Sequence, residues 1–107
     1  MDVSIGSEQF VVRACSSFFS QFRGWMFRLS LPHDGLFFIF SSEKHIILHM
    51  FFVFRSLDIV FISSDMKVVC VKKHVKPFTP FLCGNGKYIL EVLDCRSVCP
   101  GDLVQIK

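Results

Sequence analysis

The stretch LDIVFISSDMKVVCVKKHV, residues 57–75, decides the expected fold of this chain. Residues 57–62 are apolar except for Asp58, and they are rich in β-branched and aromatic side chains, which favours a strand over a helix. Residues 63–67 are mostly polar and indicate a turn, after which residues 68–75 again carry several valines. Two strand-like segments joined by a polar turn predict a β-hairpin over residues 57–75.

Asp58 interrupts the first strand of this hairpin, where alternation predicts two buried faces. The two faces are Leu57, Ile59, Phe61 and Asp58, Val60, Ile62. An ionised carboxylate at such a position needs partners, because an unpaired charge in an apolar interior is very costly. We expect these partners to be backbone amides of the neighbouring turn or one of four side chains: Arg23, Arg28, Arg55 and His49.

Further strands are predicted on both sides of the hairpin. Alternation and β-branched residues indicate strands over residues 9–14, 36–40, 45–54, 87–93 and 103–106. Asn85-Gly86 is the dipeptide that suits a type I′ turn, since both central positions require positive φ, so we expect a tight turn there. Residues 94–102 should form a turn with at most a short helix.

One helix is predicted between the first two strands. Phe18, Phe19, Phe22 and Met26 recur at three- and four-residue steps behind Ser16 or Ser17 as a possible N-cap. The helix should end within residues 28–31, because Pro32 and Asp34-Gly35 are stop and turn signals.

These elements predict a mainly β fold with one short helix, a compact antiparallel β-sandwich or barrel-like single domain over residues 1–107. The length suits one domain with one sizeable core. Fourteen Phe residues against one Trp and one Tyr suggest a dry aromatic core.

Composition excludes several classes of protein. A chain with 51% hydrophobic and 20% charged residues is not intrinsically disordered. No apolar run reaches the roughly 18 residues that a membrane-spanning helix needs, so we expect no membrane span. The N-terminus shows neither a basic segment nor a long apolar one, which predicts no signal peptide and a cytoplasmic location.

The five cysteines do not indicate a disulfide framework, because their number is odd and no Cys-x-x-Cys spacing occurs. Cys83, Cys95 and Cys99 could form a zinc site with a histidine as the fourth ligand. We favour the alternative, in which these thiols are reduced and act as small apolar packing groups. Neither a metal nor another cofactor is therefore expected.

The formal net charge is +3, and five lysines lie between Asp65 and Glu91 with no acid among them: Lys67, Lys72, Lys73, Lys76 and Lys87. On a regular strand, Lys72, His74 and Lys76 would share one face, and a nucleic-acid surface is conceivable. We favour an ordinary solvated strand face that also protects a sheet edge, so no nucleic acid is expected.

Common catalytic motifs are missing from the chain. It contains no Gly-x-Ser-x-Gly, no His-Glu-x-x-His and no complete phosphate-binding loop. His33, His45, His49 and His74 could each serve as a base for a cysteine nucleophile, but no spacing selects a pair.

A family resemblance adds to this interpretation. It rests on RGWMFR (23–28), GLFFIF (35–40), HMFF (49–52), LDIVF (57–61), KYILE (87–91) and PGD (100–102). In this order, over about residues 13–106, the chain resembles the uncharacterised family called domain of unknown function 192, or uncharacterised protein family 0127, and HMFF is similar to its archaeal members. The resemblance implies a small β-sandwich-like fold with a short helix, and it implies no activity.

The chain departs from the family pattern at several positions. Trp25 replaces a usual Leu, Ser56 replaces a usual Pro, and the turn at Asp65-Met66 lacks the usual Gly. Residues 91–101 are also shorter than in bacterial members, which carry a helix there.

Two functions remain open. The first is a non-enzymatic module that binds a small ligand or a protein partner through the helix and residues 45–58, with Arg23, Arg28, His49 and Asp58 as polar groups. The second is a small enzyme that uses Asp58 or His49 as general base and an arginine as electrophile. We favour binding over catalysis, because a fold alone implies no reaction. The arginines could also pair locally, with Asp58 as a structural carboxylate.

Overall fold

The computed structural model describes residues 2–15, 35–48, 56–76 and 82–106. These ranges form seven strands: β1 (Asp2–Ile5), β2 (Glu8–Cys15), β3 (Gly35–Leu48), β4 (Leu57–Ile62), β5 (Val68–Val75), β6 (Leu82–Val92) and β7 (Val104–Ile106). The helix predicted behind Ser16 lies outside the described residues. Within the described ranges, no helix is long and apolar enough to cross a membrane.

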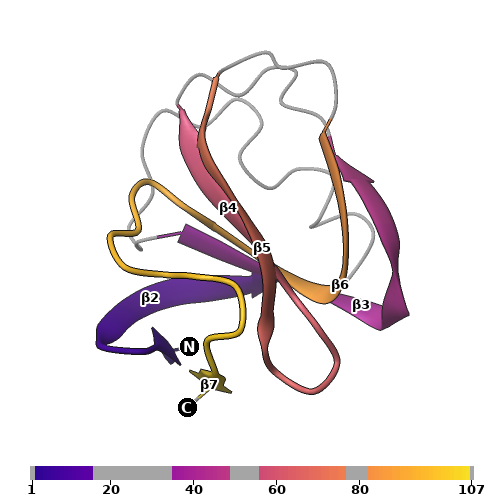
Figure 1. The fold of residues 1–107 in the computed structure, drawn as a ribbon, viewed down its shortest axis with the longest axis horizontal. Helices are drawn as coiled ribbons and strands as arrows, with labels where there is room; N and C mark the ends of the chain where they lie inside the picture. Colours follow the sequence, from indigo (N-terminus) through magenta and orange to yellow (C-terminus); the bar gives the residue numbers. More distant parts are fainter. Residues whose placement is uncertain (1, 16–34, 49–55, 77–81, 107) are drawn as a thin grey trace.

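The strands form one sheet in the order β5-β4-β6-β3-β2-β1-β7 (Figure 1). Neighbouring strands pair antiparallel as expected, except that β2 and β3 run parallel. This sheet is therefore mixed rather than purely antiparallel. A β2–β3 connection of 19 residues, 16–34, is long enough for the crossover that a parallel pair needs.

The sheet closes on itself near the tip of the β4–β5 hairpin. Lys67 forms a β-bridge with Leu103, and the Val68 amide donates to the Asp102 carbonyl at 2.9 Å. The Val104 amide donates to the Met66 carbonyl at 2.8 Å. The two edge strands therefore meet at one end, and the fold is a small β-barrel, in agreement with the barrel-like prediction.

The predicted hairpin over residues 57–75 is confirmed. Its turn is closed by the Ser63 amide, which donates to the Lys67 carbonyl at 2.8 Å, and by the Met66 amide, which donates to Ser63 at 3.0 Å. Met66 adopts a φ of 63°, the left-handed conformation that favours glycine. The family's usual Gly in this turn is thus explained by the backbone, although this chain carries Met.

The predicted turn at Asn85-Gly86 is wrong. Both residues lie inside β6, where they pair with His45 and Lys44 of β3. A Cβ on Gly86 would lie 2.9 Å from the Ile62 carbonyl oxygen, and one on Gly84 would lie 3.0 Å from the Phe61 ring. These glycines therefore allow β6 to approach β4 closely and are not needed for positive φ. Likewise, the polar residues 41–44 do not end β3; they fall in a register shift between Ile39 and Lys44.

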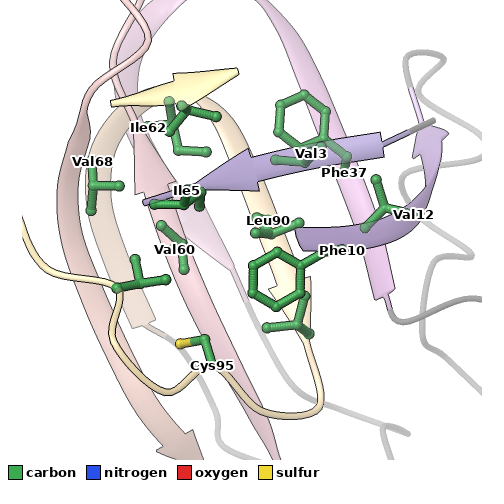
Figure 2. Close-up of a cluster of buried hydrophobic side chains, with 13 residues drawn as sticks. Val3, Ile5, Phe10, Val12, Phe37, Val60, Ile62, Val68, Leu90 and Cys95 are labelled. Carbon is green, nitrogen blue, oxygen red and sulfur yellow. The ribbon is translucent and has the colours of Figure 1, made fainter. Parts of the chain in front are cut away.

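Buried side chains form two clusters on opposite faces of the central strands. The inner cluster fills the barrel and includes Val3, Phe10, Phe37, Val60, Leu90 and Cys95 (Figure 2). The outer cluster consists of Leu36, Phe38, Ile46, Leu57, Ile59, Phe61 and Ile89. All six residues of β4 are buried and alternate between the clusters around Asp58, which confirms the prediction of two buried faces. Aliphatic residues outnumber Phe in both clusters, so the expected aromatic core is only part of the described core.

Candidate functional site

The Asp58 side chain is 0% exposed at the start of β4, and three groups donate hydrogen bonds to its carboxylate. Oδ1 accepts the His74 amide at 2.7 Å, while Oδ2 accepts the Cys95 amide at 2.8 Å and Lys73 Nζ at 2.9 Å. The expectation that this buried carboxylate needs partners is confirmed, and two of them are backbone amides, but these lie in β5 and in the loop after β6 and not in the neighbouring turn. Its charged partner is a lysine, which the sequence analysis did not predict.

Asp58 faces a β-bulge in β5. Leu57 pairs with Val75 and Ile59 pairs with Lys72, so Lys73 and His74 together oppose the single residue Asp58. His74 has a φ of 52°, a conformation that is costly for a residue other than glycine. Because Asp58 binds Lys73 Nζ and the His74 amide, it holds this bulge in place.

The bulge changes which residues of β5 share a face of the sheet. Paired residues share a face, so Lys72 and Val75 lie on the side of Ile59 and Leu57. The extra residue shifts the alternation by one, and Lys72 and Lys76 therefore fall on opposite faces. The predicted common face of Lys72, His74 and Lys76 is wrong for this reason.

The same lysine ties β5 to the loop that follows β6. Lys73 Nζ donates to the Cys95 carbonyl, lies 3.6 Å from Cys95 Sγ, and approaches Asp94 Oδ1 at 3.9 Å. The Cys95 side chain packs into the inner cluster (Figure 2). Lys73 thus binds Asp58 and the loop after β6, while 41% of its side chain stays exposed to solvent.

Glu8, at the start of β2, holds the next residues of this loop. Its Oε1 accepts the Arg96 amide at 2.8 Å, the Ser97 amide at 2.5 Å and Ser97 Oγ at 3.0 Å. Carboxylates from β2 and β4 therefore bind three consecutive loop amides, those of residues 95–97.

Asp58, Lys73 and Cys95 each favour the protonation state that they already have at neutral pH. Burial opposes ionisation of Asp58, but the bonds from the His74 amide, Lys73 and the Cys95 amide hold its pKa below the ordinary value. The hydrogen bond to Asp58 raises the pKa of Lys73. Burial, together with the Asp58 charge, raises the pKa of the Cys95 thiol to about 11. The cluster consequently holds a carboxylate, an ammonium and a neutral thiol.

The other predicted site residues, Arg23, Arg28 and His49, lie outside the described residues, as does Arg55. Sequence analysis missed Lys73, His74 and Cys95 as partners of Asp58. One signal was present, because the polar run at residues 72–74 interrupts a valine-rich strand. Residue 95, however, follows a different strand and carries no local signal for this contact.

The zinc arrangement considered for Cys83, Cys95 and Cys99 does not form in the described part of the chain. Cys95 is buried, whereas Cys83 and Cys99 are exposed, and all three are free thiols. Among the described residues, no group of three or more His, Cys, Asp or Glu side chains is placed to hold a metal ion.

Glu91 is a second buried acid that the sequence analysis missed. It is 7% exposed on β6 and pairs with Leu36 of β3 and Ile59 of β4, both members of the outer cluster. Burial raises the pKa of its carboxyl to about 8. The sequence carried a signal for Glu91, because, like Asp58, it is an acid within an apolar strand.

Comparison with known proteins places this fold in a family. The model of domain of unknown function 192 (DUF192), described as "Uncharacterized ACR", matches residues 1–105. The chain belongs to the DUF192 family. The family is uncharacterised, so membership carries no established activity for this chain.

A curated relative of the DUF192 chain is the UPF0127 protein of Thermococcus sibiricus (strain DSM 12597 / MM 739). The two are 35% identical over 98 residues, which cover 85% of this chain and 62% of the relative. The chain thus spans about three fifths of that relative's length.

Two crystal structures share the DUF192 fold. One is a proposed transcription regulator from Sinorhizobium meliloti 1021, with a TM-score of 0.86 at 20% identity, covering 97% of this chain and 91% of that one. The other is a protein of unknown function from Novosphingobium aromaticivorans DSM 12444, with a TM-score of 0.87 at 24% identity. The match covers 98% of this chain and 84% of that one. At these identities the likeness establishes the fold alone.

Proposed function

We propose that this DUF192 chain is a non-enzymatic binding module for a small ligand or a protein partner. One observation carries the proposal: the buried Asp58 carboxylate already accepts hydrogen bonds from three donors of the fold. A general base needs a pKa near the working pH and access to a proton. Asp58 is fully buried, and its pKa lies below the ordinary value, so it is better suited to shaping a surface than to catalysis.

The surface that Asp58 shapes is the bulged part of β5. His74 is 74% exposed there, and Lys72 is exposed beside it. Arg96 is exposed on the loop that Asp58 and Glu8 hold. Bulges often redirect a side chain at functional sites, and backbone strain of this kind is retained where the surrounding structure imposes it. We propose that Lys72 and Arg96, together with the exposed His74 side chain, recognise an acidic ligand or peptide.

The alternative is an enzyme with Asp58 or His49 as general base and an arginine as electrophile. For Asp58, the hydrogen bonds just described count against this role. His49 and the arginines lie outside the described residues, so this version stays a prediction. We also propose a cytoplasmic location without nucleic-acid binding, supported by the free thiols of Cys70, Cys83, Cys95 and Cys99 and by the ion pair of Lys73 with Asp58.

A titration followed by amide NMR tests the binding proposal. The probe is a glutamate-rich decapeptide, with a lysine-rich decapeptide and a short DNA duplex as controls. We expect saturable shifts at residues 72–76 and 94–97 with the acidic peptide alone. Lys72→Glu should abolish the shifts, whereas Lys44→Glu, at an exposed lysine of β3, should retain them. Absence of saturation, or equal responses to both peptides, would contradict the proposal.

A further inference from the structure

Glu91 is an acid in an otherwise apolar part of the outer face of the sheet. Strand register places it between Leu36 of β3 and Ile59 of β4. Paired residues share a face and alternate residues return to it, so Ile89 and Phe61 form the next row of the same face. These four apolar neighbours belong to the outer cluster, and each is 0% exposed.

The carboxyl of Glu91 has no polar partner in the described part of the chain. No hydrogen bond or ion pair reaches it there, and the residue is 7% exposed, so water does not replace the missing partner. A buried polar group without a hydrogen bond already costs free energy, and its ionised form costs far more. The carboxyl therefore suits this position only while it holds its proton, in agreement with its pKa of about 8.

Two titratable side chains of β5 lie on the same face. Lys72 is exposed and pairs with Ile59, which places it two strands from Glu91, at about 10 Å. Cys70 pairs with Phe61 and packs against the outer cluster, where burial raises the pKa of its thiol above the ordinary 9.0. Within the described parts of β3, β4, β5 and β6, no charged group therefore lies beside the Glu91 carboxyl to offset its ionisation.

The opposite face of the same strands is held by other contacts. Val60 and Leu90 point into the inner cluster (Figure 2). Asp58 and Glu8 bind the amides of residues 95–97 on that side of the sheet. Proteins open locally in separate packing units at a lower cost than global unfolding. Ionisation of Glu91 should therefore act on the outer face first.

We propose that ionisation of Glu91 admits water to the outer cluster while the inner cluster stays packed. The carboxyl thereby acts as a pH-sensitive switch on one face of the barrel. One proton is released as the outer cluster becomes hydrated, so the equilibrium between the packed and hydrated states shifts about tenfold per pH unit between pH 4.5 and about pH 8. This switch is separate from the Asp58 cluster and does not depend on the proposed binding function.

Methyl NMR with a soluble paramagnetic agent between pH 6 and pH 9 tests the proposal, because adjacent residues of one strand report on opposite faces. Ile59 and Ile89 probe the outer cluster, while Val60 and Leu90 probe the inner cluster. We expect the paramagnetic relaxation of the Ile59 and Ile89 methyls to rise with pH and to level off near pH 8. The relaxation of the Val60 and Leu90 methyls should stay constant, and a return to pH 6 should restore the original signals.

Glu91→Gln keeps the size of the side chain but cannot ionise, so its outer methyls should stay protected at every pH. Asp2→Asn, at an exposed acid of β1, should respond as the wild type does. Outer methyls that stay protected up to pH 9 in the wild type would overturn the proposal, as would an equal response of the inner methyls or the same response in Glu91→Gln. The carbon-13 signal of the Glu91 carboxyl in the wild type provides a test without any variant. A midpoint near the ordinary 4.5 in the folded protein would also overturn the proposal.

Discussion

At the scale of single residues, two buried acids in neighbouring strands have opposite electrostatic environments. Asp58 receives two amide protons and an ammonium, which keep it ionised. Glu91 lies among apolar residues, and within the described ranges no hydrogen bond or ion pair reaches its carboxyl, so burial keeps it protonated well above its usual range. The difference comes from the partners and not from the residue type.

Removing the Asp58 carboxylate should destabilise the fold. Asp58→Ala leaves the His74 and Cys95 amides without their acceptor and removes one of the two acceptors of Lys73, and we expect a loss of roughly 3 to 5 kcal/mol in the free energy of unfolding. Asp58→Asn keeps an oxygen acceptor and should cost about half as much. Urea unfolding measures both. A loss below about 1 kcal/mol for Asp58→Ala would indicate that Asp58 is not a structural carboxylate.

Glu91 should make the protein less stable as the pH rises. Its pKa is about 8 in the fold and 4.5 ordinarily, so between these values the folded state holds a proton that the unfolded state has released. Stability therefore falls from about pH 4.5 to pH 8 and then levels off. Glu91→Gln removes this titration and should gain up to about 5 kcal/mol relative to the wild type by pH 9. Equal slopes for both proteins in urea melts from pH 5 to 9 would contradict this.

At the scale of elements, β5 differs most from a regular strand. It has a bulge opposite Asp58, a second register shift between Phe61 and Ile62 of its partner strand, and the left-handed Met66 just before it. Irregularities of this kind protect an edge strand from pairing with other chains. The edge protection expected from lysines is therefore reinforced by the backbone itself.

The left-handed backbone at Met66 predicts that glycine is a better replacement than alanine at this position. Met66→Ala and Met66→Gly both lose the packing of the Met side chain against the inner cluster. Only glycine also relieves the φ of 63°. We expect Met66→Gly to be more stable than Met66→Ala by about 1 kcal/mol, the reverse of the usual order in regular structure. Thermal melts of the two variants compare them directly, and a more stable alanine variant would show that the turn carries no strain.

At the scale of the whole molecule, the loop over residues 93–99 joins distant parts of the barrel. Glu8 of β2 and Asp58 of β4 bind its amides, while Lys73 of β5 binds the Cys95 carbonyl. The loop also contributes Cys95 and Val98 to the inner cluster. Its charged contacts and the packing of the barrel should therefore be lost together.

This coupling predicts cooperative unfolding in acid. Burial opposes ionisation of Glu8, but the bonds from Ser97 and Arg96 hold its pKa below the ordinary 4.5, and the Asp58 pKa lies below 3.8. Their stabilisation is complete above these ordinary values and is lost as the pH falls through the lower folded-state values. Unfolding should therefore begin below about pH 4. Glu8→Gln should weaken this dependence in melts from pH 2 to 5, while Asp2→Asn, at an exposed acid of β1, serves as the control.

The sequence by itself determined the features that depend on local chemistry. Alternation over residues 57–62 and the polar turn at residues 63–67 are local patterns, so the hairpin, its two buried faces and the need of Asp58 for partners could be predicted. The family resemblance was confirmed for the same reason, because its motifs are short runs of residues.

Only the tertiary structure decided which residues meet. Lys73 and Cys95 lie 15 and 37 positions from Asp58, and strand order with a one-residue bulge brings them to its carboxylate. Asn85-Gly86 has the local signature of a turn, yet the close approach of β6 to Ile62 makes it part of a strand. Local preferences amount to about 1 kcal/mol per residue, and the packing and hydrogen bonds of a barrel outweigh them.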